Sequence, residues 1–135
     1  MEGADAYVAT TRMVRVTATP SFSPERSDPA NGAYFWTYAV RIENQGQETV
    51  QLISRHWMIT DAQGRTEEVR GPGVVGEQPV LRPGEHFDYV SGCPLRTPSG
   101  AMGGAYQMVT ASGAAFEAVI PTFSLHLPEA TRRPN

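Results

Sequence analysis

The 135-residue chain contains a single cysteine, no lysine and no long apolar segment. Because Cys93 has no second cysteine to pair with, an internal disulfide framework is excluded and a reducing compartment is suitable. Lysine-dependent chemistry is also excluded, since all 11 basic residues are arginines. No apolar run approaches membrane-spanning length, and the acidic start of the chain lacks the apolar core of a secretory signal. These features predict a cytoplasmic protein with no membrane insertion.

Charge is scarce as well. Charged residues make up 19% of the chain, and the formal net charge is -3. Such a surface has no general attraction for nucleic acids or anionic lipids. The arginines form no stripe with interleaved aromatic residues, which is the pattern of single-stranded nucleic-acid binders. We therefore expect no nucleic-acid partner.

Glycine and proline, in contrast, are abundant, with 13 and 11 copies. They separate short segments in which apolar residues recur at every second position, as in strands. The clearest segment is 34–44, where Trp36, Tyr38, Val40 and Ile42 should face a core. The predicted strands cover 7–19, 34–44, 49–60, 65–70, 85–91, 106–111, 114–120 and 122–127, and 95–104 is expected to be irregular.

About seven short strands without a segment of helical period predict an all-β fold of the fibronectin type III-like or immunoglobulin-like β-sandwich type. The sandwich domain should cover residues 7–127, with 1–6 and 128–135 as flexible termini. Residues 81–87, Leu-Arg-Pro-Gly-Glu-His-Phe, resemble the corner before a late strand of fibronectin type III domains. Phe87 stands where that corner has tyrosine, so only the packing part of the corner can form.

Several blocks of this chain resemble the ApaG family. They include Trp-Thr-Tyr at 36–38, Ser-Arg-His-Trp at 54–57, Gly-Pro-Gly-Val-Val-Gly at 71–76 and Leu-Arg-Pro-Gly at 81–84. The resemblance implies a fibronectin-III-like sandwich, and bacterial single-domain members are associated with cobalt and magnesium efflux. Related domains in eukaryotic F-box adaptors and in a polymerase-interacting protein look like protein-binding modules. No catalytic reaction comes with the resemblance.

The loop 71–76 spells the G-x-G-x-x-G dinucleotide motif, which acts by opening a helix. Pro79 and Pro83 prevent a helix from continuing here, so that use of the motif is excluded. Two alternatives remain. Gly71, Gly73 and Gly76 supply backbone freedom and close packing, or their N–H groups form a nest for a phosphate with Arg70 and Arg82 beside it.

The segment Arg55-His56-Trp57 is the second candidate site. Period-two alternation places Arg55 and Trp57 on one face of the strand and Leu52 on the other. With apolar residues on both sides, the strand could be central and packed on both faces. In the alternative, Arg55 and Trp57 point outward and anchor a partner, as these residue types are enriched at hot spots.

Metal and catalytic patterns are weak. His56, His86 and His126 lie far apart in the sequence; His86 and Asp88 share a strand face, but they form no ligand set by themselves. We therefore expect no metal site, no catalytic residues and no cofactor. The predicted function is non-catalytic binding and regulation linked to Co²⁺/Mg²⁺ efflux or divalent-cation homeostasis, through an unknown protein partner, with a homo-oligomer left open. The alternative is a phosphate-, pyrophosphate- or nucleotide-binding module that uses the Gly71–Gly76 loop.

Overall fold

A computed structural model describes residues 5–128. Within that range the chain forms nine strands, two short 3₁₀ turns and no α-helix. The strands are β1 (Tyr7–Thr11), β2 (Val14–Phe22), β3 (Tyr34–Asn44), β4 (Val50–Asp61), β5 (Thr66–Pro72), β6 (Val80–Leu81), β7 (His86–Leu95), β8 (Gly100–Thr110) and β9 (Ala115–Leu125). The 3₁₀ turns η1 (Pro24–Arg26) and η2 (Pro29–Asn31) lie between β2 and β3. No helix of the described residues is long and apolar enough to cross a membrane.

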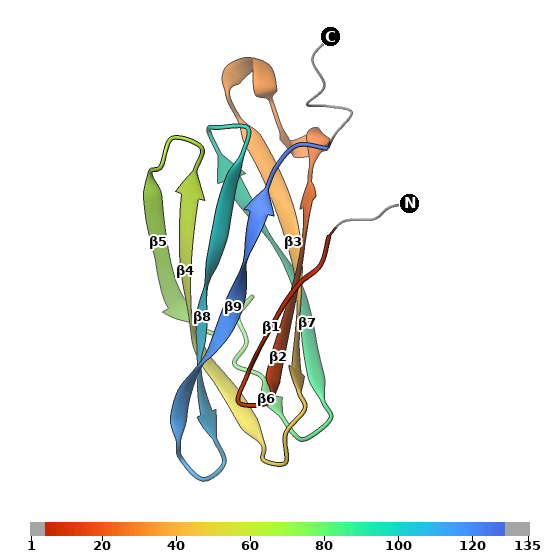
Figure 1. Cartoon of the computed structure of the whole chain (residues 1–135), viewed down its shortest axis with the longest axis vertical. Coiled ribbons are helices and arrows are strands. Elements are labelled where there is room, and N and C mark those ends of the chain that lie inside the picture. Colours follow the sequence, from red (N-terminus) through yellow and green to blue (C-terminus); the bar gives the residue numbers. More distant parts are fainter. Residues whose placement is uncertain (1–4, 129–135) are drawn as a thin grey trace.

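The strands form two antiparallel sheets that face each other (Figure 1). The first sheet has the order β1-β2-β3-β7, and the second has the order β5-β4-β8-β9. The short β6 pairs with the start of β4, next to the part of β4 that pairs with β5. The predicted all-β, fibronectin type III-like sandwich is confirmed. Of the predicted flexible termini, residues 1–4 and 129–135 lie outside the described residues.

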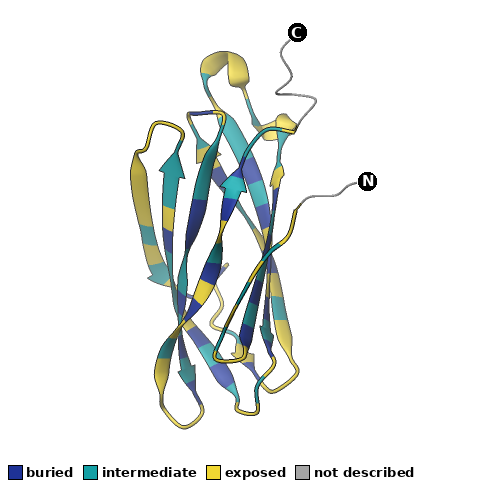
Figure 2. Ribbon diagram, viewed as in Figure 1, coloured by how far each residue is buried: buried dark blue, intermediate teal, exposed yellow. Residues whose placement is uncertain are grey.

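The core lies between the sheets, and β3 shows why. Trp36, Tyr38, Val40 and Ile42 are buried, while Ala39 and Arg41 between them are exposed. Buried and exposed residues alternate along most strands in Figure 2, as the pleat requires. The predicted inward face of this strand is therefore correct.

Two predicted strand boundaries were wrong for one physical reason, an irregular backbone. The run 7–19 is a hairpin, because Arg12 and Met13 adopt φ values of 49° and 67° and turn β1 into β2. Turns of this kind usually carry Asn or Gly, so Arg-Met at these positions is no recognisable turn signal. Likewise, Pro121 does not end a strand. It lies inside β9 where the register with β8 shifts between Met102 and Gly104, a bulge that accommodates a proline.

A second bulge changes the faces of β4. The register of β4 against β8 shifts between Leu52 and Ser54. A bulge adds one residue to one strand, so the side chains beyond it switch faces relative to simple alternation. As a result Leu52 and Trp57 are both buried, whereas alternation had placed them on opposite faces. The segment 95–104 also differs from the prediction, since β8 begins at Gly100.

The two long sides of the sandwich are different. On one side β1 contacts β9, and the backbone N–H of Val119 donates to Oγ1 of Thr11 at 3.1 Å. Figure 1 shows β1 running beside β9. On the other side the terminal strands are β7 and β5, and residues of both strands line the same pocket. The sandwich is thus closed along β1 and β9 and hollowed between β7 and β5.

Replacing Trp36 by Ala should lower the free energy of unfolding by about 3–5 kcal/mol, because the change leaves a cavity in the core near the start of β3. The ring is 1% exposed, and its Nε1–H donates to the backbone oxygen of His126 at 2.9 Å. Urea unfolding measures the change, and Trp36→Phe, which keeps most of the ring volume, should cost less. A loss within 0.5 kcal/mol, the ordinary scatter of surface changes, would contradict the assigned core.

Candidate functional site

The hollow between β7 and β5 is the main concave surface among the described residues. It consists of an outer pocket of ≈ 660 Å³ and an inner pocket of ≈ 380 Å³. Both pockets are lined by Ile59, Glu67 and Pro94, so they adjoin. We call the two together the open-side groove. The volume of each pocket lies within the range of sites that hold small molecules or the side chains of a partner.

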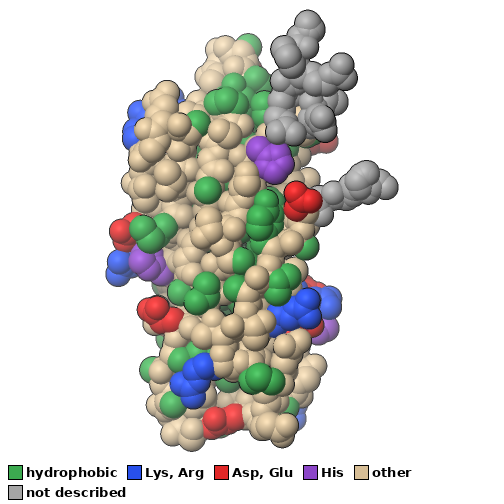
Figure 3. All heavy atoms as spheres, viewed as in Figure 1, with side chains coloured by type: hydrophobic (Ala, Val, Ile, Leu, Met, Phe, Trp, Pro, Cys, Tyr) green, Lys and Arg blue, Asp and Glu red, His purple; other side chains and the backbone are tan. Residues whose placement is uncertain are grey.

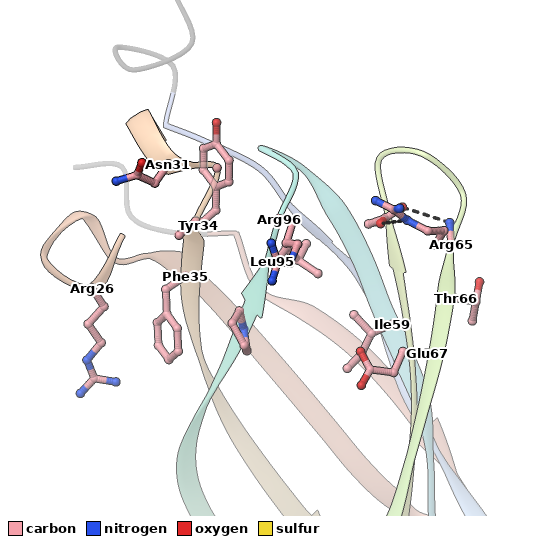
Figure 4. A pocket seen from close by; sticks show the side chains of 14 residues that line it. Arg26, Asn31, Tyr34, Phe35, Ile59, Arg65, Thr66, Glu67, Leu95 and Arg96 are labelled. Carbon is pink, nitrogen blue, oxygen red and sulfur yellow. Dashed lines mark hydrogen bonds and ion pairs between the residues drawn. The ribbon is translucent and has the colours of Figure 1, made fainter. Parts of the chain in front are cut away.

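The outer part of the groove is polar. Figure 4 shows Ile59 and Glu67, from β4 and β5, across the pocket from Leu95 and Arg96. Arg65 is bound to Asp61, with Nε donating to the carboxylate at 2.9 Å. In the same pocket, the guanidinium of Arg26 lies over the ring of Phe35, 5.2 Å from its centroid.

The inner part of the groove is built around Arg55. Its Nη1 donates to the backbone oxygens of Pro72 and Gly73, each at 2.9 Å. The guanidinium therefore fastens the end of β5 and the loop after it to β4. Arg55 is half-buried, and it lines the inner pocket together with Trp57, Val69 and Val75. The positively charged guanidinium of Arg55 thus lies among apolar side chains.

Two tyrosines, Tyr38 and Tyr89, line the inner pocket together with Arg55. The hydroxyls of Tyr89 and Tyr106 share a hydrogen bond between the two sheets. Burial raises the pKa of both phenols, and it raises the pKa of Tyr38 as well. The charge of Arg55 lowers these values, but it is a smaller effect than burial. The hydroxyl groups of these tyrosines are therefore neutral at physiological pH. In this form they can donate and accept hydrogen bonds, but they do not act as bases.

Cys93 is also at the groove, but it is not an activated nucleophile. The residue is 2% exposed, and burial raises the pKa of its thiol to about 11. At neutral pH only about one thiol in ten thousand would be ionised, whereas reactive cysteines have lowered pKa values. The side chain serves as a small apolar part of the wall.

Each glycine of the loop has a structural role. Gly71 packs against Arg55, since a Cβ there would lie 3.0 Å from Nη2. Gly73 has φ +62°, and a Cβ would collide with the backbone oxygen of Glu77. Gly76 has φ +82° in a tight turn in which Val74 and Glu77 exchange backbone hydrogen bonds of 2.8 and 2.9 Å.

The loop is arranged differently from an anion nest. The N–H groups of Gly73, Val74 and Glu77 donate to backbone oxygens of the protein. The backbone oxygens of Pro72 and Gly73 face Arg55, so this part of the loop presents acceptors. A nest instead needs several N–H groups that converge on one point.

The two arginines expected to flank an anion do not converge on the loop. Arg70 bonds Glu68 at 3.0 Å, and Nε of Arg82 is 3.6 Å from Glu85. The pKa of the Glu68 carboxyl is lowered, chiefly by Arg70 and then by His56. Anion binding by this loop stays a prediction, and the positions of Arg70 and Arg82 do not support it, because both contact glutamates.

The predicted pair Arg55 and Trp57 lies at the groove, but it does not point outward as two anchors. Trp57 is 3% exposed and makes an edge contact with Tyr38, with ring centroids 5.2 Å apart. The outward alternative is therefore wrong for Trp57. The other alternative, a central strand packed on both faces, is correct for the position of β4 in its sheet but wrong for its outer face, which carries the exposed Met58. Of Arg55 and Trp57, only Arg55 offers a charged group to the groove.

The histidines lie away from both pockets. Asp88 binds Arg41 through two hydrogen bonds of 2.8 and 2.9 Å, which lower the pKa of its carboxyl, while His86 is 3.6 Å away. His56 bonds Glu68 at 3.1 Å, on the outer side of the second sheet. In residues 5–128 no group of three or more His, Cys, Asp or Glu side chains is placed to hold a metal ion.

Sequence reasoning missed most of the groove. Tyr38 and Tyr89 were not recognised as neighbours of Arg55, because β4 meets β3 and β7 only across the sandwich. Val75 was also missed. It has φ 42°, which is rare and costly for a β-branched residue, and its side chain is 56% exposed at the groove. Neither feature has a signal in the sequence.

The architecture defines the class of protein: an antiparallel β-sandwich that carries an open groove between the edges of its two sheets. The sequence profile of the ApaG domain matches residues 24–110. The chain is 62% identical over 129 residues to Protein ApaG of Rhodospirillum centenum, covering 96% of this chain and 99% of that one. Protein ApaG of Bradyrhizobium sp. is 60% identical, with 93% and 97% of the two chains covered.

Solved structures agree. The crystal structure of a putative ApaA protein from Bordetella pertussis has a TM-score of 0.83 and 47% identity, with 95% of this chain and 99% of that chain covered. The C-terminal domain of Wzt has a TM-score of 0.54 at 9% identity, which is a likeness of fold alone. This chain belongs to the ApaG family.

The structure predicts unequal effects for two loop glycines. Gly73→Ala should lower the free energy of unfolding by about 3 kcal/mol, because strain at positive φ adds to a collision with a backbone oxygen. Gly76→Ala should cost about 1 kcal/mol, since it has the same backbone strain but open space around the new Cβ. Denaturant unfolding of the two variants checks the difference, and equal losses would contradict the loop geometry.

Stability should also fall in alkali. The pKa values of Tyr89 and Tyr106 are raised above the ordinary 10.0, so the unfolded chain loses these protons at lower pH than the folded one. Their contribution is complete below pH 10 and is lost as the pH rises, by up to about 1.4 kcal/mol per pH unit for each group. Urea unfolding between pH 8 and 11 measures the slope. Tyr106→Phe should reduce it, and an unchanged slope would contradict the assignment.

Proposed function

We propose that this chain is a non-catalytic binding and regulatory protein whose protein partner occupies the open-side groove. The observation that carries the proposal is the asymmetry of the sandwich. One side is closed by β1 and β9, while the other has a groove lined by tyrosine, tryptophan and arginine. These residue types dominate the binding energy of protein interfaces.

The chemistry of the groove supports binding over catalysis. A nucleophile needs a neighbouring base or a lowered pKa. Burial instead raises the pKa values of Cys93, Tyr38 and Tyr89, and no histidine lines either pocket of the groove. The groove can therefore supply hydrogen bonds, apolar contact and a fixed positive charge, which suit recognition.

The link to Co²⁺ and Mg²⁺ efflux, which the family resemblance implies, fits an indirect role. His56 contacts Glu68, and His86 contacts Asp88, which also binds Arg41. We propose that the chain regulates divalent-cation transport through its partner. The alternative, phosphate or nucleotide binding at Gly71–Gly76, requires converging N–H groups, and those of Gly73 and Val74 already donate within the protein. Calorimetric titration with pyrophosphate, ATP, Co²⁺ and Mg²⁺ tests the two alternatives. Heat from any of these ligands would count against the proposal.

Two matched substitutions test the groove itself. Val75 and Val80 are 56% and 55% exposed, but only Val75 lines the groove. Val75→Asp should abolish retention of the native partner in affinity purification, because a charge then stands at the apolar rim. Val80→Asp should retain the partner. Both variants should stay folded, since both side chains are exposed and, at Val75, Asp tolerates the positive φ better than Val.

The same variants connect the groove to cation homeostasis. Cells that lack this chain should be more sensitive to Co²⁺, and the wild type and Val80→Asp should restore tolerance. Val75→Asp should not restore it. If Val75→Asp retains the partner and restores tolerance, the groove is not the binding site.

A further inference from the structure

The free edge of β7 borders the open-side groove. β7 is terminal in the first sheet, and it pairs with β3 without a register shift from Tyr34↔Leu95 to Glu43↔His86. At the end of this ladder Asn44 exchanges backbone hydrogen bonds with Glu85 and Gly84. Since the residues of a central strand bond alternately to either side, the even-numbered residues of β3 bond β7.

This alternation decides which groups of β7 are unused. Tyr89, Ser91 and Cys93 oppose even-numbered residues of β3 and bond to them. Val90 and Gly92 lie between them, so their N–H and C=O groups point away from β3 toward the free edge. Val90 is 62% exposed, and no charged side chain stands at these two positions.

The other terminal strands are protected. β1 and β9 contact each other across the closed side of the sandwich. The edge of β5 carries Glu68 and Arg70, exposed and paired at 3.0 Å, and charged residues at an edge prevent further strand pairing. The segment 90–92 of β7 is the terminal-strand edge without such protection.

A strand added to this edge would place alternate side chains in the groove. Residues paired with Val90 would point to the outer face, as Val90 and Ala39 do. Their neighbours would point inward, as Tyr89 and Cys93 do, toward Arg55, Val69 and Val75. Main-chain bonds would then supply affinity, and the inward side chains would supply specificity.

The positive charge of the groove favours an acidic side chain at the inward positions of an added strand. The two pockets are lined by Arg26, Arg55, Arg65 and Arg96 but only by Asp61 and Glu67 of opposite sign. Asp61 is bound to Arg65. The rest of the chain is acidic enough to give a net charge of -3. In Figure 3 the charged side chains of the face shown are scattered, singly or in small groups, and both signs are present. The groove is therefore a basic region on an acidic protein.

We infer that the partner is an extended peptide segment that adds as a strand to β7 at Val90–Gly92 and directs a carboxylate side chain into the groove, flanked by apolar residues. The inference rests on the proposed function, because it specifies the partner of the same groove. The apolar positions would contact Val69 and Val75 in the inner pocket, and the carboxylate would meet the exposed Arg26 and Arg96 of the adjoining outer pocket.

A capped synthetic peptide, acetyl-Thr-Val-Thr-Glu-Thr-Val-Thr-amide, tests the geometry, with its Val and Glu side chains as the inward set. NMR titration should slow hydrogen exchange at the amides of Val90 and Gly92. The Gln analogue should bind about tenfold more weakly, the loss expected for one charge-assisted hydrogen bond. A peptide N-methylated at the residues that face β7 should not bind. Equal binding by the N-methylated peptide, or exchange protection at β5 in place of β7, would overturn the inference.

Two substitutions at one position provide the matched control. Val90→Pro removes the N–H that points to the free edge, where a proline is tolerated, and should weaken peptide binding about tenfold or more. Val90→Thr keeps this N–H and should bind like the wild type. If Val90→Pro does not fold, the N-methylated peptide on the wild type decides. A dimer of the wild type in sedimentation that Val90→Pro dissociates would assign the edge to a second copy and overturn the inference.

Retention of the native partner by the two variants distinguishes the proposed function from the inference about strand addition. If Val75→Asp abolishes its retention and Val90→Pro does not, the groove binds the partner but strand addition is wrong. If neither change affects retention, the proposed function fails as well.

Discussion

The groove depends on the contact between Arg55 and the backbone oxygens of Pro72 and Gly73. The guanidinium of Arg55 holds the end of β5 and the glycine loop against β4. The same group lines the inner pocket and gives it a positive charge. Gly71 makes room for that group, and the turn that follows places Val75 at the rim. A buried charge is costly unless it is hydrogen-bonded, and the two oxygens meet this requirement. The backbone oxygens of the loop therefore bind Arg55 of the protein itself. The need to pack closely around this guanidinium explains the glycine at position 71 without a bound anion.

The same contact explains why the two sides of the sandwich differ. Along β1 and β9 the sheets meet and close the core. Along β7 and β5 the loop fastened by Arg55 lies beside an opening lined by Tyr38, Tyr89 and Glu67. A protein interior is densely packed, so a persistent opening with aromatic walls is a natural place for a partner. The strained backbone of Val75 at its rim is consistent with this use, since strain of this kind concentrates at functional sites.

The alternation of β3 was predicted correctly because its backbone is regular and its inward residues are large and apolar. The faces of β4 were predicted wrongly because a bulge between Leu52 and Ser54 adds one residue to the count. For the same reason Pro121 was read as the end of a strand, although a bulge accommodates it in β9. Bulges have no fixed residue signature, so period-two reasoning fails beyond them.

The fold class, the family and the residues of the glycine loop can be read from the amino-acid sequence alone, because these follow from local periodicity, turn chemistry and matching motifs. It could not bring Arg55 together with Tyr89, nor leave Val90 at a free edge next to the groove. Those placements depend on which strands pair and on which sides of the sandwich close. They are decided by packing between residues far apart in the chain, and only the tertiary structure shows that packing.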